Sequence, residues 1–202
     1  MIGSLVSFKH RHPRIWAMVE SVNGALFRLR YGRVERVAGE VLKDYSVAGC
    51  SFSVVEEQDL PQLERFLAGF DEESLKWFHP HAFDGAALKR LFRNSSFLMM
   101  KVTGPEGELA GYFFLRCFFI GRAFTGLIVA PEWLGRDIGS KIWAAAADIC
   151  ERLRLRMLAT ISEENVASMA SCRKGTSVTE LERLGNGYIL VECKAKNNIK
   201  KV

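Results

Sequence analysis

The sequence predicts an α+β (α/β) fold in which helices flank a mixed, mostly antiparallel central sheet, preceded by an N-terminal extension. Short apolar runs rich in β-branched or aromatic residues alternate with segments of helical periodicity. Two adjacent runs, 96–102 and 109–120, flank a turn of glycine and proline that is typical of a hairpin. A third run, 124–129, leads through a glycine-bearing turn into a long helix. The chain therefore contains both a strand–strand hairpin and a strand–helix connection.

Composition and cysteine usage restrict the class of protein. The chain has 202 residues, 49% of them hydrophobic, which is enough for one well-buried core. It contains no run of about 18 apolar residues, so we expect no transmembrane helix, and the first residues lack a signal-peptide cleavage site. The five cysteines have no metal-ligand spacing. Reduced thiols, a cytoplasmic location and no metal site are therefore expected.

The charge is concentrated at the two ends of the chain. The net charge is +5, with eight basic and four acidic residues in 1–47 and four lysines in 194–202. Such ends suit an anionic membrane surface, nucleic acid or an acidic partner. We expect them to be solvated, with no specific nucleic-acid binding, because no basic patch is interleaved with aromatic residues.

Residues 1–47 are predicted to be an extension packed on the main domain. A helix is expected to start at Pro13, which suits a first helical turn. Gly24 should interrupt it, and from there the pattern also fits a hairpin that turns at Tyr31 and Gly32. A helix buried against its own domain is favoured over contact with a membrane surface, and a homodimer contact or a lid stays open. The expected apolar face contains Ile15, Trp16, Val19, Val22, Leu26, Phe27 and Leu29.

The main domain is predicted over 51–194, followed by a basic tail, 195–202. It opens with a strand at 51–57, and the helix after it is expected to be capped by Asp59. Two more helices are expected, at 71–79 and 81–94, separated by Pro80 because a helix rarely continues into proline. The hairpin of 96–120 follows.

After the run at 124–129, the remaining elements alternate. A long helix is expected from Ser140, then a strand at 156–161 and a short helix at 165–173 that ends at Gly175. A last hairpin joins 178–181 to 188–193.

The strand–turn–helix at 124–152 is the predicted centre of function. The strand ends at Pro131, and the turn contains Gly135 and Gly139. The first amides of a helix have no intrahelical partner and the helix dipole is positive there, so a phosphate fits. Spacing alone is also compatible with a strand–turn–helix that binds nothing.

Two motifs strengthen the functional prediction. The segment VAPEWLGRDIG at 129–139 matches V-x-P-x-x-[QR]-G-x-[GA]-x-[GA] at the valine, the proline and two glycines, with Leu134 and Asp137 as departures. We expect Arg136 to offset the charge of Asp137, or the Asp137 carboxylate to cap the helix start. With the order of elements, this motif resembles the acetyl-CoA turn of the GNAT superfamily of acyl-CoA-dependent N-acyltransferases, over about 51–194.

The second motif of that family, N-x-x-[AS]-x-x-x-Y-x-K-x-G-F, lies downstream. Asn165, Ser168 and Lys174 keep its register, while Cys172 stands at the tyrosine that often protonates the leaving thiolate in this family. The resemblance implies acetyl-CoA as co-substrate, and a parting of 124–129 from 156–161 that admits its pantetheine arm. The implied cofactor contacts are Leu127, Ile128, Val129, Leu134, Gly135, Arg136, Asp137, Ile138, Gly139, Ser140, Asn165 and Ser168.

The catalytic acid and base are predicted from residue chemistry. His79 and His81 are candidates because histidine is the usual side chain for acid–base work, and the segment that holds them usually lines the acceptor pocket in this family. Glu163 is a second candidate base, and the Cys172 thiol is a candidate proton donor. The alternatives are surface or capping histidines, a solvated glutamate and a packed cysteine.

We therefore expect an N-acetyltransferase that moves an acetyl group from acetyl-CoA to the primary amine of a small molecule. An amino sugar or a sugar nucleotide is the specific expectation for the acceptor. Two alternatives stay open. One is an N-acyltransferase acting on a protein or peptide, docked by the basic ends. The other is a non-catalytic CoA-binding module, which Asp137 and the missing tyrosine would fit.

Overall fold

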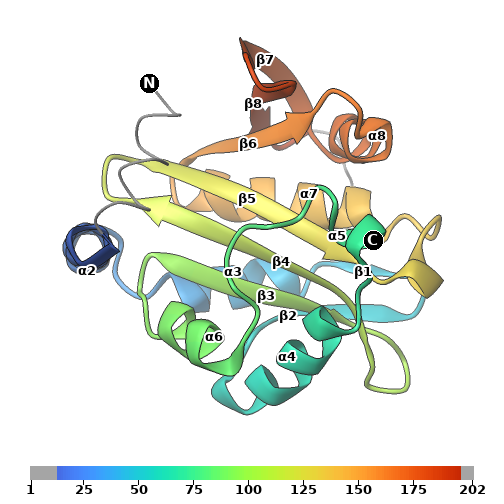
Figure 1. Cartoon of the computed structure of the whole chain (residues 1–202), viewed down its shortest axis with the longest axis horizontal. Coiled ribbons are helices and arrows are strands. Elements are labelled where there is room, and N and C mark those ends of the chain that lie inside the picture. Colours follow the sequence, from blue (N-terminus) through green and yellow to red (C-terminus); the bar gives the residue numbers. More distant parts are fainter. Residues whose placement is uncertain (1–12, 197–202) are drawn as a thin grey trace.

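A computed structural model describes residues 13–196, with side chains from Met18 onward. Its centre is an eight-stranded sheet in the order β1-β2-β3-β4-β5-β6-β8-β7 (Figure 1). The strands are β1 (Ser46–Val47), β2 (Cys50–Val54), β3 (Phe97–Thr103), β4 (Leu109–Phe118), β5 (Arg122–Val129), β6 (Arg156–Ser162), β7 (Ser177–Leu184) and β8 (Tyr188–Lys194). All neighbours are antiparallel except β5 and β6, which confirms the predicted mixed sheet.

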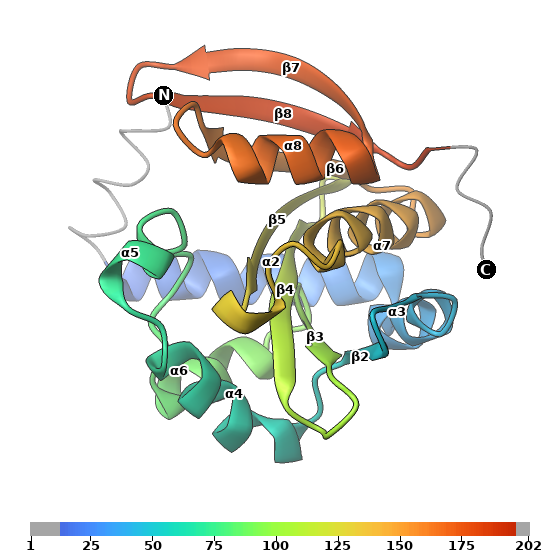
Figure 2. The ribbon, with the colours of Figure 1, turned by 90° about the vertical axis from the view of Figure 1, so that its right-hand side faces the viewer.

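Helices cover both faces of this sheet. They are α2 (Pro13–Tyr31), α3 (Val34–Leu42), α4 (Leu60–Ala68), α5 (Glu72–Leu75), α6 (Gly85–Phe92), α7 (Ile138–Arg152) and α8 (Val166–Gly175), with 3₁₀ turns at Glu57–Asp59 and Pro131–Trp133. Figure 2 shows α4, α5 and α6 on one side of the central strands, and α3 and α7 on the other. The predicted α+β architecture is therefore confirmed.

The only parallel strand pair among the described residues is short. β5 and β6 pair from Arg122 with Arg156 to Phe124 with Leu158, and the pairing stops there. Beyond Phe124, β5 stays bonded to β4 as far as Val129, while β6 stays bonded to β8. The predicted parting of these two strands is confirmed, and it leaves one side of β5 without a strand partner.

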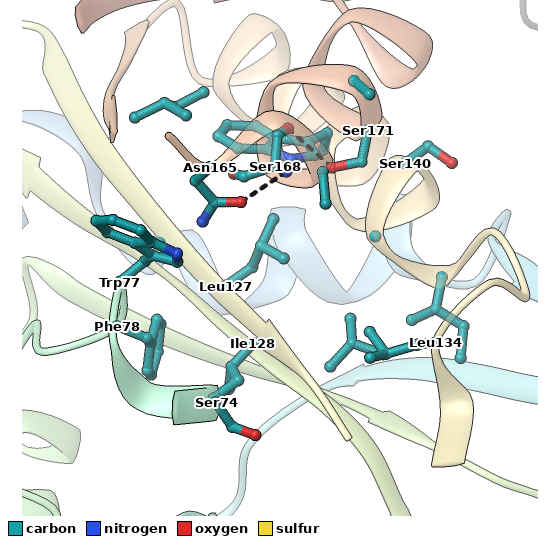
Figure 3. Close-up of a pocket in the computed structure, with 18 of the residues that line it drawn as sticks. Ser74, Trp77, Phe78, Leu127, Ile128, Leu134, Ser140, Asn165, Ser168 and Ser171 are labelled. Carbon is teal, nitrogen blue, oxygen red and sulfur yellow. Dashed lines mark hydrogen bonds between the residues drawn. The ribbon is translucent and has the colours of Figure 1, made fainter. Parts of the chain in front are cut away.

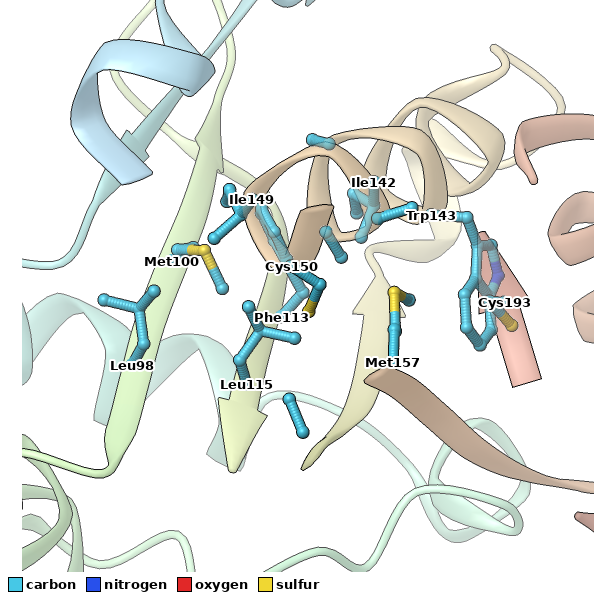
Figure 4. Packing of buried hydrophobic residues seen from close by; sticks show 14 of the residues in the cluster. Leu98, Met100, Phe113, Leu115, Ile142, Trp143, Ile149, Cys150, Met157 and Cys193 are labelled. Atoms are coloured by element: carbon cyan, nitrogen blue, oxygen red, sulfur yellow. The ribbon is translucent and has the colours of Figure 1, made fainter. Parts of the chain in front are cut away.

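The larger core lies between the sheet and α7. Phe113 and Leu115 of β4 point into it, as do Ile142 and Ile149 of α7, and all four are fully buried (Figure 4). The small side chains at 144–147 are also buried, so α7 packs close to the sheet. This packing holds the beginning of α7, and with it the bend that precedes the helix, in a fixed position.

The second core lies under α4 and α6 and is rich in aromatic rings. Tyr112 and Phe114 point into it, because side chains alternate along β4. Phe97 stacks on Phe114 with ring centres 4.9 Å apart, and Phe78 packs against both Tyr112 and Phe114. The loop that carries Phe78 is thereby attached to the middle of the sheet.

The N-terminal segment differs from its prediction. α2 is one continuous helix, so neither the interruption at Gly24 nor the alternative hairpin occurs. A Cβ at position 24 would lie 2.8 Å from Asn94 Oδ1, so a larger residue there would displace the Asn94 side chain. Phe27 is buried, but the predicted apolar face is not the buried one. Val19, Val22, Leu26 and Leu29 remain exposed, while the side chains of Ile15 and Trp16 lie outside the described residues.

Polar contacts explain which face of α2 is attached. The Asn23 amide nitrogen donates to Ser96 Oγ (3.0 Å) and to the Cys117 carbonyl (2.9 Å), and Phe119 N donates to its oxygen (3.1 Å). Arg30 donates to the Phe119 carbonyl (2.8 Å). Hydrogen bonds to the end of the β4–β5 hairpin therefore orient the helix, a contact that hydrophobic periodicity does not reveal.

Smaller differences concern element ends. β1 and α3 were not predicted, and α5 is a single turn capped by Asp71. Asp59 does not cap α4: its carboxylate accepts from Glu56 N and pairs with Lys101 at 2.6 Å. Within the described residues, no helix combines the length and apolar character that a membrane crossing needs. Most of the predicted basic tail, 197–202, lies outside the described residues.

Candidate functional site

A cleft of about 580 Å³ opens where β5 and β6 part. Its walls come from β5, the bend at 131–140, the start of α7, the end of β6, α8 and the residues around α5. Figure 3 shows Leu127 of β5 near Trp77, next to α5, and Asn165, at the start of α8. The cleft is therefore bordered from both faces of the sheet.

Side-chain alternation divides the lining between the two faces. On β6, Ile161 belongs to the core beneath α7, so Thr160 and Ser162 face the other way. On β8, Ile189 belongs to that same core, so Tyr188 also faces away from α7. Three hydroxyl groups thus line the part of the cleft that lies on the face away from α7.

The bend between β5 and α7 is open. Gly135 (φ 75°) and Asp137 (φ 68°) adopt left-handed backbone conformations, and a Cβ placed on Gly135 would meet no atom within 4 Å. In the described part of the chain, the amides of residues 135–140 donate to no backbone carbonyl. These donors begin a helix of 15 residues, so they form a site for an anion such as a diphosphate.

Asp137 is neutralised by a lysine from the neighbouring helix. Its Oδ1 lies 2.8 Å from Lys174 Nζ and accepts a hydrogen bond from Ser140 Oγ. Partial burial tends to raise the pKa of Asp137, but the hydrogen bonds from Lys174 and Ser140 and the charge of Lys141 bring it below its usual value. The carboxylate is therefore ionised and paired at the edge of the anion site.

Both predicted arrangements of Asp137 are wrong. The Arg136 guanidinium lies over the Trp133 ring, 4.5 Å from its centre, so Arg136 is not the partner. Asp137 occupies the N-cap position of α7 but makes no side-chain cap bond. Lys174 is the counter-ion because α8 packs against the first turn of α7. Of the other predicted contacts, Leu134 lines the cleft and is 64% exposed.

The predicted contacts on α8 do line the cleft. Asn165 caps this helix, since its Oδ1 accepts from Ser168 N at 2.9 Å. Asn165, Ser168 and Ser171 are all part of the lining. At the other end of α8, a Cβ on Gly175 would lie 2.2 Å from the Ser140 carbonyl oxygen. Glycine at position 175 therefore permits the close approach of α8 to the beginning of α7.

The two predicted histidines lie outside the cleft lining. His79 is exposed on the loop after α5. His81 is inserted among Phe83, Phe97 and other rings of the second core. Its Nδ1 lies 2.8 Å from the Ala82 carbonyl, which can only accept, so Nδ1 carries the proton. In the neutral ring, Nε2 then accepts from the Tyr112 hydroxyl at 3.3 Å.

Cys172 and Glu163 are also placed clearly. Cys172 is fully buried and its Sγ lies 3.5 Å from that of Cys193, not in the cleft. The hydrogen bond between the thiols lowers the pKa of Cys172 and raises that of Cys193. Glu163 lies after the end of β6 and accepts from Arg183 at 3.1 Å. All five cysteines are buried and free.

Several lining residues escaped the sequence analysis. Thr160, Ser162 and Tyr188 were not singled out, although alternation along the predicted strands would have placed the first two on one face. Lys174 was noted only for its register. No local signal connects it with Asp137, because the pair depends on how two helices pack.

Comparison with protein families gives one match. A model of the acetyltransferase (GNAT) family matches residues 60–175, which is more than half of the chain. That range includes β3 to β6, the bend and α8. The curated proteins contain no match to this sequence.

Solved structures share the fold at low sequence identity. Spermidine N-acetyltransferase from Vibrio cholerae, in complex with CoA and spermine, is 16% identical with a TM-score of 0.58, covering 72% of this chain and 94% of that one. The GNAT domain of S. lividans PAT is 15% identical with a TM-score of 0.60, covering 75% and 93%. An aminoglycoside acetyltransferase in complex with coenzyme A and kanamycin is 14% identical with a TM-score of 0.56, covering 73% and 95%.

Proposed function

The chain belongs to the acetyltransferase (GNAT) family, and we propose that it moves an acetyl group from acetyl-CoA to the primary amine of a small molecule. One observation carries this proposal: the open bend and the gap between β5 and β6 border a single cleft. A diphosphate held by the amides of 135–140 leads the pantetheine arm into the gap and brings the thioester beside 127–129. We propose 51–194 as the catalytic unit and α2–α3 as an added layer.

The geometry suits direct attack by a neutral amine. The nitrogen forms a bond to the thioester carbon, the carbon–sulfur bond breaks, and the nitrogen loses a proton while the thiolate gains one. Positioning of the two reactants in one cleft supplies most of what the reaction needs. Beyond Phe124, β5 has no strand on its β6 side, so amides there are free of strand pairing and suited to stabilise the developing oxyanion.

The acid and base remain predictions. The contacts of the partly buried His81 with aromatic rings, and the burial of Cys172 beside Cys193, support packing roles for both. His79 is exposed and Glu163 is paired with Arg183. We propose Glu163, which follows the lining residue Ser162 at the end of β6, as the group that exchanges protons with the cleft.

The lining on the face away from α7 supports an amino sugar as acceptor. Thr160, Ser162 and Tyr188 offer hydroxyl groups, and Trp77 offers a ring on which the apolar face of a sugar can stack. Within the described lining, Asp137 and Lys174 are the charged residues, and they are paired with each other. A substrate with one amine suits this surface better than a polycation, because unpaired buried charge is costly. A sugar nucleotide is the alternative acceptor.

Two measurements test the function. Acetyl-CoA at millimolar concentration should raise the melting temperature, because a ligand that binds only the folded state stabilises it. Thiol release should then be measured with glucosamine, a sugar nucleotide carrying a free amine, spermidine, kanamycin and a lysine peptide. We expect turnover with glucosamine. Absence of any stabilisation by acetyl-CoA would reject the whole assignment, whereas stabilisation with turnover of the peptide alone would reject only the acceptor.

A matched pair of variants examines the acceptor contacts. Tyr188→Phe removes a hydroxyl from the cleft lining and should raise the KM for glucosamine about five- to twentyfold, since a lost hydrogen bond to a polar ligand costs about 1–2 kcal/mol. The KM for acetyl-CoA should not change. Tyr31→Phe on α2, outside the cleft lining, is the control and should leave both constants unchanged.

A further inference from the structure

A second cavity, of about 720 Å³, lies at the other end of β4 from the bend. Its walls are α2, the loop at 80–82, α6, the beginning of β3 and the end of β4. Both ribbon views show α2 crossing this end of the sheet (Figures 1 and 2). Within the described residues it shares no lining residue with the cleft.

Aromatic side chains separate the two spaces. Phe78 lines the cleft, while His81 and Phe97 line the second cavity. Phe114 lies between them, with its ring centre 6.4 Å from Phe78, 6.0 Å from His81 and 4.9 Å from Phe97. A molecule in the second cavity therefore contacts the rear of the wall that bounds the cleft, without entering the cleft.

The α2 wall of this cavity exposes large apolar side chains. Met18, Val19 and Val22 of α2 line it and are 62%, 48% and 52% exposed, and Phe119 is 40% exposed. Large side chains that expose this much apolar surface on neighbouring turns are typical of a binding surface. The cavity therefore suits a ligand with an apolar body.

Charges at the cavity specify the other end of such a ligand. Its lining contains Arg90 and Arg116 but a single acid, Glu20, which is paired with Arg116. Arg90 forms no ion pair within the part of the chain that the structure describes. The guanidinium group has a planar arrangement of donors that matches a carboxylate. The surplus charge is thus positive and suited to one carboxylate.

Part of the wall of this cavity lies outside the matched family region. The family match begins at residue 60, so it does not include α2, which supplies the exposed apolar wall. Asn23, on the same helix, fixes α2 over the cavity through its bonds to Ser96 and Cys117. The added helix therefore both creates the space and determines its apolar character.

We propose that this cavity binds a small amphipathic carboxylate, with its apolar body against α2 and its carboxylate held by Arg90. The proposal does not depend on the acetyl-transfer function, because the two sites share no residue among those described. The ligand belongs to the class of short aliphatic or aromatic carboxylic acids. The apolar part of the ligand contacts Val19 and Val22 of α2, and its carboxylate contacts Arg90 of α6.

The test uses octanoate as the probe on the full chain, with CoA added at saturation so that the cleft is occupied. Isothermal titration calorimetry should show saturable binding at one site. Octylamine, which has the same chain and the opposite charge, should bind at least about tenfold more weakly. No saturable binding of octanoate, or equal binding of octylamine, would overturn the proposal.

Two pairs of variants locate the site. Val22→Glu puts a charge on the apolar wall and Arg90→Gln removes the unpaired cation. Each should weaken octanoate binding at least about fivefold. The controls are Leu29→Glu on α2 and Arg93→Gln after α6, which lie outside the lining and should change binding by less than about twofold. Equal effects of a variant and its control would refute the location.

Analytical sedimentation of the same variants tests whether a second copy of the chain, and not a carboxylate, covers α2. If a second copy of the chain covers α2, the wild type should be a dimer and both Val22→Glu and Leu29→Glu should dissociate it. That result would overturn the carboxylate proposal in favour of a self-interface. A monomer that binds octanoate only with Val22 and Arg90 intact supports it.

Discussion

Asp137 shows how a residue that conflicts with its sequence context is accommodated by its neighbours. A carboxylate next to a diphosphate site is repulsive, but Lys174 lies 2.8 Å away and Ser140 donates to the same oxygen. In the ligand-free protein these groups satisfy one another. When a diphosphate binds, Lys174 has two competing anions within reach, and Asp137 reduces the share of its charge available to the ligand.

This competition leads to a prediction for Asp137→Asn. Asparagine tolerates the left-handed backbone at this position and can still accept from Ser140. Removal of the negative charge should lower the Kd for acetyl-CoA about three- to tenfold, a typical size for one partly screened charge. Calorimetry checks this, with Glu132→Gln, an exposed acid outside the lining, as the control. Weaker binding by the variant would mean that Asp137 instead holds Lys174 in its binding position.

His81 allows a second prediction at the same scale. Its ring contacts four aromatic residues and bonds to Tyr112, so His81→Gln should lower the free energy of unfolding by about 1–2 kcal/mol. The pH profile of kcat/KM should keep its shape, because the ring lies outside the cleft lining. Denaturant titration and pH-dependent kinetics measure the two effects.

The control for this prediction is His79→Gln, which should alter neither quantity because His79 is exposed. If His81→Gln instead removes the ionisation of the base from the pH profile while the fold stays stable, the residue is the base after all. The predicted base would then act through Tyr112.

The lining residues on α8 could be predicted better than those on β8. Asn165 and Ser168 stand in a motif with fixed spacing, because the Asn165 side chain caps α8 by accepting from Ser168 N, and both residues line the cleft. Tyr188 belongs to a strand whose neighbours are set by the whole sheet. Its position beside Ser162 follows from pairing of β6 with β8, which no short motif records.

At the scale of elements, the contact between α7 and α8 decides the shape of the anion site. The two helices approach so closely at Gly175 that a methyl group there would overlap the Ser140 carbonyl oxygen and crowd Trp143. Gly175→Ala should therefore lower the free energy of unfolding by about 1–3 kcal/mol, as overpacking usually does. It should also raise the KM for acetyl-CoA, because α8 must move away from the bend.

Gly39→Ala is the matched control for this prediction. Gly39 lies inside α3, where a Cβ would meet no atom within 4 Å. Alanine there should raise the free energy of unfolding by about 0.5–1 kcal/mol, since it favours the helix and restricts the unfolded chain. Differential scanning calorimetry compares the two variants, and an equal destabilisation of both would contradict the packing argument.

The elements with strong periodicity were predicted well, and those held by polar contacts were not. β3, β4 and α7 each have an apolar pattern that extends over the whole element, so the sequence predicted all three. The face of α2 that packs on the domain was predicted wrongly. Asn23 and Phe27 attach the helix to the domain, whereas its aliphatic residues stay exposed. β1 has two residues and exists only through pairing with β2.

At the scale of the whole molecule, the order of elements was sufficient to identify the fold. The strand order is sequential through β6 and then ends with β8 before β7, and it follows from hairpins together with helical connections between β2 and β3, between β5 and β6, and between β6 and β7. The extent of the gap between β5 and β6 could not be predicted from β5 itself, because both strands continue well beyond their last shared pair. That gap depends on α7 and α8 being packed in a way that directs β6 away from β5.

The short seam between β5 and β6 has a mechanical consequence. Among the described residues, the two parts of the sheet, β1–β5 and β6–β8, are joined by three residue pairs between β5 and β6 and by the bond from Arg156 N to the Gly121 carbonyl. The two parts of the sheet are therefore joined at one end of β5 and β6, and a molecule bound in the gap contacts both parts. Hydrogen–deuterium exchange should therefore slow on acetyl-CoA binding mainly at 125–129 and 159–162, and much less in β2 and β3. Uniform slowing over both parts of the sheet would show instead that acetyl-CoA only raises the global stability of the protein.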